Sequence, residues 1–334
     1  MNVPPTDEEQ PRPSWTRRAA KGAARLTVRE YIPMAAMLAF WAIVALAIGH
    51  ADTARLLAAT VLLRGATMLA ELSTSSPMRA RGRAEPAIQR RSLRNAALMQ
   101  LGSLAVTALV LAVLTAGLRH AGHDLMAALL WASAIGLPAR SVRMANPKLF
   151  PRRLRLHVTT SAVVAAGAAW ALGGGPVAMA LAYGAREWIG TLTGLIAGNS
   201  YMPNSRNDEK LRFAEVAWTT VVTSRRLLTY RLTKNILSVF GPFGNFAART
   251  GRGLNVHSKL ERYMPHKRAG FLLFALLTGG GAVAVAWHSS EPVALIASAG
   301  LAQLCAVALN VLILWRYLPD RDDPRLVIDE DEED

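Results

Sequence analysis

The chain has 334 residues, of which 52% are hydrophobic, and it carries a formal net charge of +15. Apolar runs of about twenty residues recur along it, which is the length that crosses a bilayer, so an ordinary soluble domain is excluded. The Lys and Arg residues lie mainly in the segments between these runs, and we see no set of surface aromatic residues on which nucleic-acid bases could stack. We therefore expect no nucleic-acid partner.

The apolar runs predict an all-α fold, a polytopic membrane bundle of about eight transmembrane helices. The second and fourth are short or charged, so a re-entrant or interfacial placement stays open for them. Four connections between neighbouring runs are short, which arranges the helices in four hairpins. The predicted helices are residues 31–50, 54–72, 96–118, 123–139, 156–173, 176–198, 270–288 and 292–315.

Lys and Arg are distributed unevenly over the two sets of connections. The two tails and the three long connections together hold thirty-four of them, whereas the four short connections and their margins hold only Arg55 and Arg119. Positive residues are retained on the cytoplasmic side of a membrane. We therefore expect a multi-pass protein of the cytoplasmic (inner) membrane with both termini in the cytoplasm.

These observations divide the chain into five segments. A basic cytoplasmic tail precedes a six-helix membrane bundle, which is followed by a basic amphipathic cytoplasmic segment, a transmembrane hairpin and an acidic cytoplasmic tail. Their expected bounds are residues 1–30, 31–198, 199–269, 270–315 and 316–334.

The amphipathic segment, residues 199–269, is too small and too basic to build a core of its own. We expect it to lie on the membrane, where three roles are open: attraction to anionic lipid headgroups, packing under the bundle, or recognition of one phosphorylated ligand. The residues expected to contact anionic lipid are Arg225, Arg226, Arg231, Lys234, Arg249 and Arg252.

Four charged residues lie inside apolar runs, where a charge is costly and normally faces a partner or a wet cavity. Arg64 and Glu71 are seven residues apart and share one helix face, and Arg186 is followed directly by Glu187. One interpretation is that pairing between the two runs fixes helix packing. The other is that a cavity exposes all four residues to a polar or anionic substrate.

The usual catalytic spacings are missing from the sequence. It contains no HExxH, GxSxG or Walker-type glycine loop, and His120 and His123 share a short connection without a second ligand pair. Cys305 is the single cysteine and falls in an apolar run, which is typical of a packing residue. We therefore expect no enzymatic activity, no metal and no cofactor.

Several short stretches from residue 127 to residue 199 resemble polysaccharide flippases of the multidrug/oligosaccharidyl-lipid/polysaccharide exporter superfamily. They are the Gly136-Leu137-Pro138-Ala139-Arg140 end of one run, the basic connection through Arg152, Arg153 and Arg155, the Gly173-Gly174-Gly175-Pro176 turn, and Ala182-Tyr183-Gly184-Ala185-Arg186-Glu187. The first six helices also resemble one lobe of that two-lobed fold. The resemblance implies transport by alternating access. The missing lobe implies either that two chains assemble or that this chain is a relative that kept the scaffold and lost independent transport.

The leading hypothesis is accordingly a transport-type membrane protein that binds or moves an amphipathic anionic substrate through Arg64, Glu71, Arg186 and Glu187. A second hypothesis is a non-transporting scaffold that recruits proteins of an envelope or exopolysaccharide pathway through residues 199–269 and the acidic tail. A third is a membrane enzyme acting on lipid phosphate. The expected partners are membrane lipids with anionic headgroups and a second copy of the chain.

Overall fold

The computed structural model describes residues 32–72, 74, 86–146, 154–196, 213, 216–220, 268–289 and 291–314, and their regular structure is helical throughout. This confirms the all-α prediction for that part of the chain. Residues 1–30, most of 199–269 and all of 316–334 lie outside the described residues. The main helices are α2 (Ile32–Ala70), α4 (Pro86–His120), α5 (Asp124–Ala134), α6 (Leu137–Ala145), α7 (Leu154–Ala171), α8 (Pro176–Ile196), α12 (Arg268–His288) and α13 (Pro292–Ile313).

Helix α2 contains the first two predicted spans and bends sharply between them. The bend is at Gly49, whose φ of 77° and ψ of 171° suit a residue without a Cβ. The Thr53 hydroxyl donates a hydrogen bond to the Gly49 carbonyl at 2.6 Å and closes the turn. The connection expected over residues 49–52 is therefore shorter than predicted, since Gly49 alone departs from helical geometry.

The predicted fourth span, residues 123–139, is wrong at its end, because the helical path continues to Ala145. A turn at residues 135–136 divides it into α5 and α6. Pro138 lacks an amide hydrogen and cannot extend the hydrogen-bond ladder of α5, but it fits the first turn of α6, where that hydrogen has no helical partner. The remaining predicted spans agree with their helices to within a few residues, except that α4 begins earlier.

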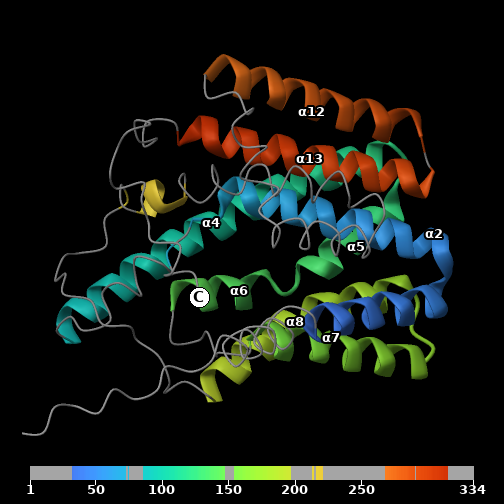
Figure 1. Ribbon diagram of the computed structural model, residues 1–334, viewed down its shortest axis with the longest axis horizontal. Helices are drawn as coiled ribbons and strands as arrows, with labels where there is room; N and C mark the ends of the chain where they lie inside the picture. Colours follow the sequence, from blue (N-terminus) through green and yellow to red (C-terminus); the bar gives the residue numbers. More distant parts are fainter. Residues whose placement is uncertain are drawn as a thin grey trace, which may run out of the picture.

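Helix α2 is the centre of the bundle, in contact with α4, α5, α7, α8 and α13 (Figure 1). The largest core cluster is built around its two halves from residues such as Phe40, Leu56, Leu129 and Met179. On the α13 side, the Asn310 side chain donates to the Met68 carbonyl at 2.9 Å and Gln303 contacts the Met68 sulfur. These two amides therefore link α13 to the end of α2.

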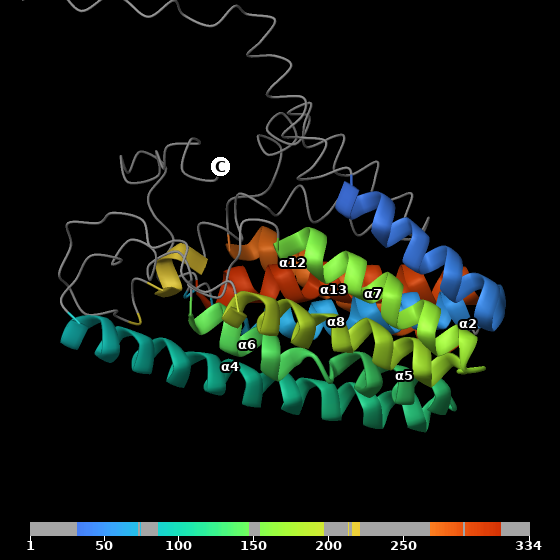
Figure 2. The ribbon, with the colours of Figure 1, turned by 90° about the horizontal axis from the view of Figure 1, so that it is seen from below.

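The outer surface of the bundle is apolar. Large hydrophobic side chains such as Leu101, Leu109, Leu273 and Leu277 are more than half exposed on α4 and α12. Figure 2 shows α4 running along one side of the bundle and extending past α6. An apolar exterior around polar interior groups is the arrangement that a lipid environment requires.

Among the described residues, five helical segments are long and apolar enough to cross a membrane: Ile32–Ala70, Leu93–His120, Asp124–Ala145, Arg268–His288 and Pro292–Ile313. The first has 39 residues, about twice the length that one crossing needs. Helix α7 has a shorter apolar part, Leu156–Ala171. These segments indicate an integral, multi-pass membrane protein.

Candidate functional site

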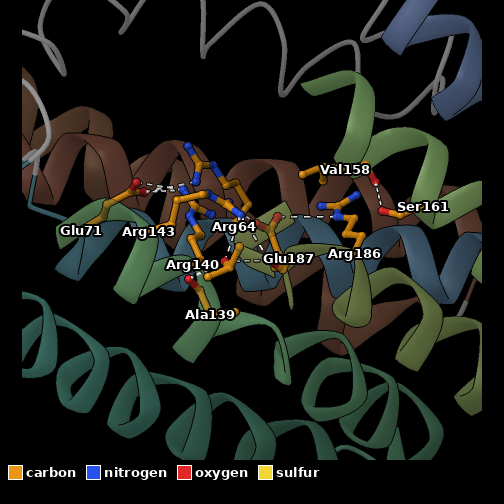
Figure 3. A network of polar contacts seen from close by, with 10 residues as sticks. Arg64, Glu71, Ala139, Arg140, Arg143, Val158, Ser161, Arg186 and Glu187 are labelled. Atoms are coloured by element: carbon orange, nitrogen blue, oxygen red, sulfur yellow. Dashed lines mark hydrogen bonds and ion pairs between the residues drawn. The ribbon is translucent and has the colours of Figure 1, made fainter. Parts of the chain in front are cut away.

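Arg64 lies in the last two turns of α2, and Glu71 directly follows this helix. Arg64 donates to Glu71 Oε2 at 3.1 Å, as expected for side chains two turns apart on one face. The Glu71 amide follows the last helical residue and still donates to the Thr67 carbonyl at 2.7 Å, so the backbone carries the carboxylate on the same face. Glu71 thus reaches Arg140 of α6 (Figure 3).

Helix α6 contributes two arginines that the sequence analysis assigned to a cytoplasmic connection. Arg140 Nη2 donates to both carboxylate oxygens of Glu71, at 2.8 and 2.9 Å. One turn further, Arg143 Nη2 donates to the carboxylate of Glu187 on α8, and its Nη1 donates to the Glu187 carbonyl at 3.2 Å. Helix α6 therefore links a glutamate of α2 to a glutamate of α8.

A second set of hydrogen bonds holds α6 and the preceding turn against α8. The Trp188 indole donates to the carbonyl of Ile135 at 2.9 Å, in the turn where the helical ladder is interrupted. The Thr191 hydroxyl lies within hydrogen-bond distance of the carbonyls of Ala139 and Glu187, at 3.0 and 2.9 Å. These contacts fix the register in which Arg143 reaches Glu187.

Two glycines bring the backbones together at this point. A Cβ on Gly136 would lie 2.3 Å from the Gly184 carbonyl oxygen, and one on Gly184 would lie 2.5 Å from the Ile135 side chain. Only residues without a Cβ allow this approach. The close contact places the middle of α8, which carries Arg186 and Glu187, directly beside α6.

Arg186 has a different environment from the other arginines. Its guanidinium carbon lies 3.5 Å from the centre of the Tyr183 ring, and its Nη1 contacts the sulfur of Met37 at 3.8 Å. Its Nε lies 3.6 Å from Glu187 Oε1, too far for a hydrogen bond, and is buried without one. Figure 3 shows its side chain extending away from the other arginines, toward Val158 and Ser161 of α7.

Six charged residues form one partly buried group. Arg143 is 8% exposed and Arg186 16%, whereas Arg64 is 31% exposed. Arg140 also interacts electrostatically with Glu187, which connects the two ion-pair groups. Four arginines face two glutamates, so the formal charge of the group is +2. We call these residues the charged cluster: Arg64, Glu71, Arg140, Arg143, Arg186 and Glu187.

The sequence identified four members of the charged cluster and missed two. Arg64, Glu71, Arg186 and Glu187 stand out because they interrupt apolar runs. Arg140 and Arg143 follow Pro138 in a basic stretch, so they resembled a topology signal. Pro138 is able to start a helix, and on that helix Arg140 and Arg143, three residues apart, would share one face. This spacing is the signal that could have revealed them.

Other predicted sites are not tested here. The expected lipid-contacting residues, from Arg225 to Arg252, lie outside the described residues. Within the ranges that the structure describes, no three His, Cys, Asp or Glu side chains come together as a metal site would require.

Comparisons with protein families, with curated proteins and with solved structures found no match to this chain. The likeness to polysaccharide flippases therefore stays a prediction from short stretches of sequence. The class that fold and site define is an all-α, multi-pass membrane protein with a buried charged cluster.

Proposed function

We propose that this is a transport-type protein of the cytoplasmic membrane that binds and moves an amphipathic anionic substrate at the charged cluster. The observation that carries the proposal is the environment of the Arg186 guanidinium. Its guanidinium lies inside an apolar bundle, over a tyrosine ring, and the carboxylate that lies beside it in the described part of the chain, Glu187, is already held by Arg143.

A guanidinium in this position favours an anionic ligand for two reasons. It is charged at every accessible pH, and its planar row of donors matches the oxygens of a phosphate or a carboxylate. In a low-dielectric bundle, a cation whose donors are incompletely used is costly, and an incoming anion removes that cost. The nearby tyrosine and methionine supply apolar surface for the rest of an amphipathic molecule.

The other charged residues of the cluster pair with one another and fix the packing of the helices. Arg143 holds Glu187, and Arg64 and Arg140 hold Glu71, so these five residues are engaged with one another across three helices. This division accommodates both interpretations of the sequence, since most of the cluster fixes packing while Arg186 stays available. Lipid-linked saccharides with a phosphate or a sugar acid have the required chemistry, which agrees with the flippase resemblance.

The test is a binding measurement on the full-length protein in detergent, with an isoprenoid diphosphate as the probe and the corresponding isoprenoid alcohol as the uncharged control. We expect the diphosphate to bind and Arg186→Ala to weaken binding by about tenfold or more, the effect of losing a charge-assisted hydrogen bond. Arg55→Ala is the matched control, because Arg55 pairs with Asp52 just after the Gly49 bend of α2 and is not a member of the charged cluster.

Equal affinity for the diphosphate and the alcohol would sink the proposal, as would unchanged diphosphate binding by a folded Arg186→Ala variant. Either result leaves the scaffold hypothesis as the better account. That hypothesis depends on residues 199–269, most of which lie outside the described residues.

A further inference from the structure

A small polar cavity lies between α2, α4 and α6, beside the Glu71–Arg140 ion pair and on the side of α6 that faces α4. Its volume is about 20 Å³. Seven of its ten lining residues are polar, although the surrounding bundle is apolar. They are Thr67, Glu71, Gln100, Ser103, Leu104, Thr107, Leu137, Arg140, Ser141 and Met144.

The polar lining comes from helix faces that the sequence spacing builds. On α4, Gln100, Ser103 and Thr107 are three and four residues apart and share one face. Leu101 and Leu109 of the same helix are 59% and 66% exposed on the outer surface. The polar stripe of α4 therefore faces the protein and its apolar stripe faces outward, which is the pattern of a helix with lipid on one side only.

The residues that line the cavity keep both donor and acceptor capacity after their hydrogen bonds within the protein are made. The hydroxyls of Thr67 and Thr107 donate to backbone carbonyls at 2.9 and 2.8 Å, so their oxygens keep acceptor capacity. Arg140 has more donors than Glu71 uses. A lining of this mixed kind is complementary to water, which donates and accepts equally.

The size of the cavity determines which molecules fit into it. A space of this volume admits about one water molecule and is too small for a saccharide or a phosphate group. The ion pairs also differ in enclosure, since Glu71 and Arg140 are 22% and 24% exposed whereas Arg143 is 8% exposed. The outer pair is thus the one within reach of solvent.

We infer that this cavity is a hydrated inlet, through which water and ions no larger than a water molecule reach the Glu71–Arg140 pair from the end of the bundle where α2 and α6 terminate. Its lining residues on α4 extend from Gln100 to Thr107, about 10 Å along the helix axis, although the space itself admits only about one water molecule. It is a site separate from Arg186, which faces α7. The inference requires α4 to lie in the membrane, but it does not depend on any substrate.

The experiment uses single cysteines in the full chain, with Cys305→Ala as the background, because Cys305 is the sole native cysteine. The probe is the silver ion, which is small, hydrated and reactive toward thiolates. Ser103→Cys and Ser141→Cys place a thiol in the inlet with a nearly isosteric change. Leu101→Cys and Leu109→Cys place it on the outer face of the same helix, and Arg94→Cys, exposed near the end of α4, is the positive control.

We expect silver to block the two inlet cysteines at least about tenfold faster than the two outer ones, because an apolar environment raises the thiol pKa and suppresses the thiolate. Blocking is measured as the loss of maleimide labelling after denaturation, on variants that elute as single species. Inlet cysteines that stay unreactive while Arg94→Cys reacts overturn the inference. Equal reactivity of Leu101→Cys and Ser103→Cys overturns it as well.

Discussion

Arg143 occupies the most enclosed position in the charged cluster, and its guanidinium is engaged with both the carboxylate and the carbonyl of Glu187. Its Nε is buried without a hydrogen-bond partner. Removing Arg143 leaves the Glu187 carboxylate without this hydrogen bond and with Arg186, at 3.6 Å, and Arg140 as its remaining cations, so its charge is only partly compensated. The contribution of Arg143 to stability therefore depends on whether Glu187 remains.

We predict that Arg143→Ala lowers the free energy of unfolding by about 1 to 3 kcal/mol, because the Glu187 carboxylate loses its closest hydrogen-bonded partner but keeps Arg186 nearby. The measurement is denaturant unfolding in mixed micelles. Arg55→Ala is the control, since Arg55 is 39% exposed and its ion pair with Asp52 should contribute at most about 1 kcal/mol.

The double variant Arg143→Ala/Glu187→Ala extends this prediction. If the cost comes from an uncompensated charge, the double variant is more stable than the sum of the two single losses implies. Additive losses would contradict the direct coupling of Arg143 with Glu187.

At the scale of elements, the turn between α5 and α6 determines where the arginines lie. Gly136 in this turn approaches Gly184 of α8 so closely that neither position has room for a side chain. The two helices consequently meet backbone to backbone, and the Trp188 and Thr191 hydrogen bonds form across this contact. The position of α6 relative to α8 follows from two missing Cβ atoms.

We predict that Gly136→Ala destabilises the bundle by about 1 to 3 kcal/mol, the usual cost of overpacking a close contact. Gly102→Ala is the matched control, because a Cβ there meets nothing within 4 Å and alanine favours a helix over glycine by about 1 kcal/mol. Thermal unfolding in detergent distinguishes the two variants. A Gly136→Ala protein as stable as Gly102→Ala would show that the helices do not pack this closely.

The bounds of some helices could be predicted from the sequence more accurately than those of others. Helices α7, α8, α12 and α13 were located to within a few residues, because each is an apolar run bounded by turns or charges. The α5–α6 region was not, because Pro138 reads as a helix stop by local rules while the structure uses it to start a new helix. The same misjudgement removed Arg140 and Arg143 from the predicted site, since only tertiary packing shows that their helix lies in the bundle.

At the scale of the whole molecule, the alternation of helix directions places connections of opposite character at the two ends. The turns at Gly122 and Gly173 are short, while α6 leads into the basic stretch after Asn146. Lys and Arg are retained in the cytoplasm, so the end that contains Glu71 is the predicted cytoplasmic end.

This orientation is tested with a phosphatase reporter that is active only outside the cytoplasm. We predict that insertion at Gly122 or Ser289 gives an active reporter and that insertion at Asn146 gives an inactive one, since these positions lie at opposite ends of the bundle. The opposite pattern would invert the proposed orientation, including the side from which the hydrated inlet opens.

The formal charge of the cluster also makes the bundle electrically responsive. A potential of 100 mV does work of up to about 2.3 kcal/mol on each elementary charge that crosses the whole membrane. A potential that is negative inside draws a group of charge +2 toward the cytoplasm, and therefore favours any arrangement in which α6 and α8 lie deeper on that side. If Arg186 holds a monovalent anion, as we propose, the charge of the cluster falls from +2 to +1, and the membrane potential then acts on it with half the force.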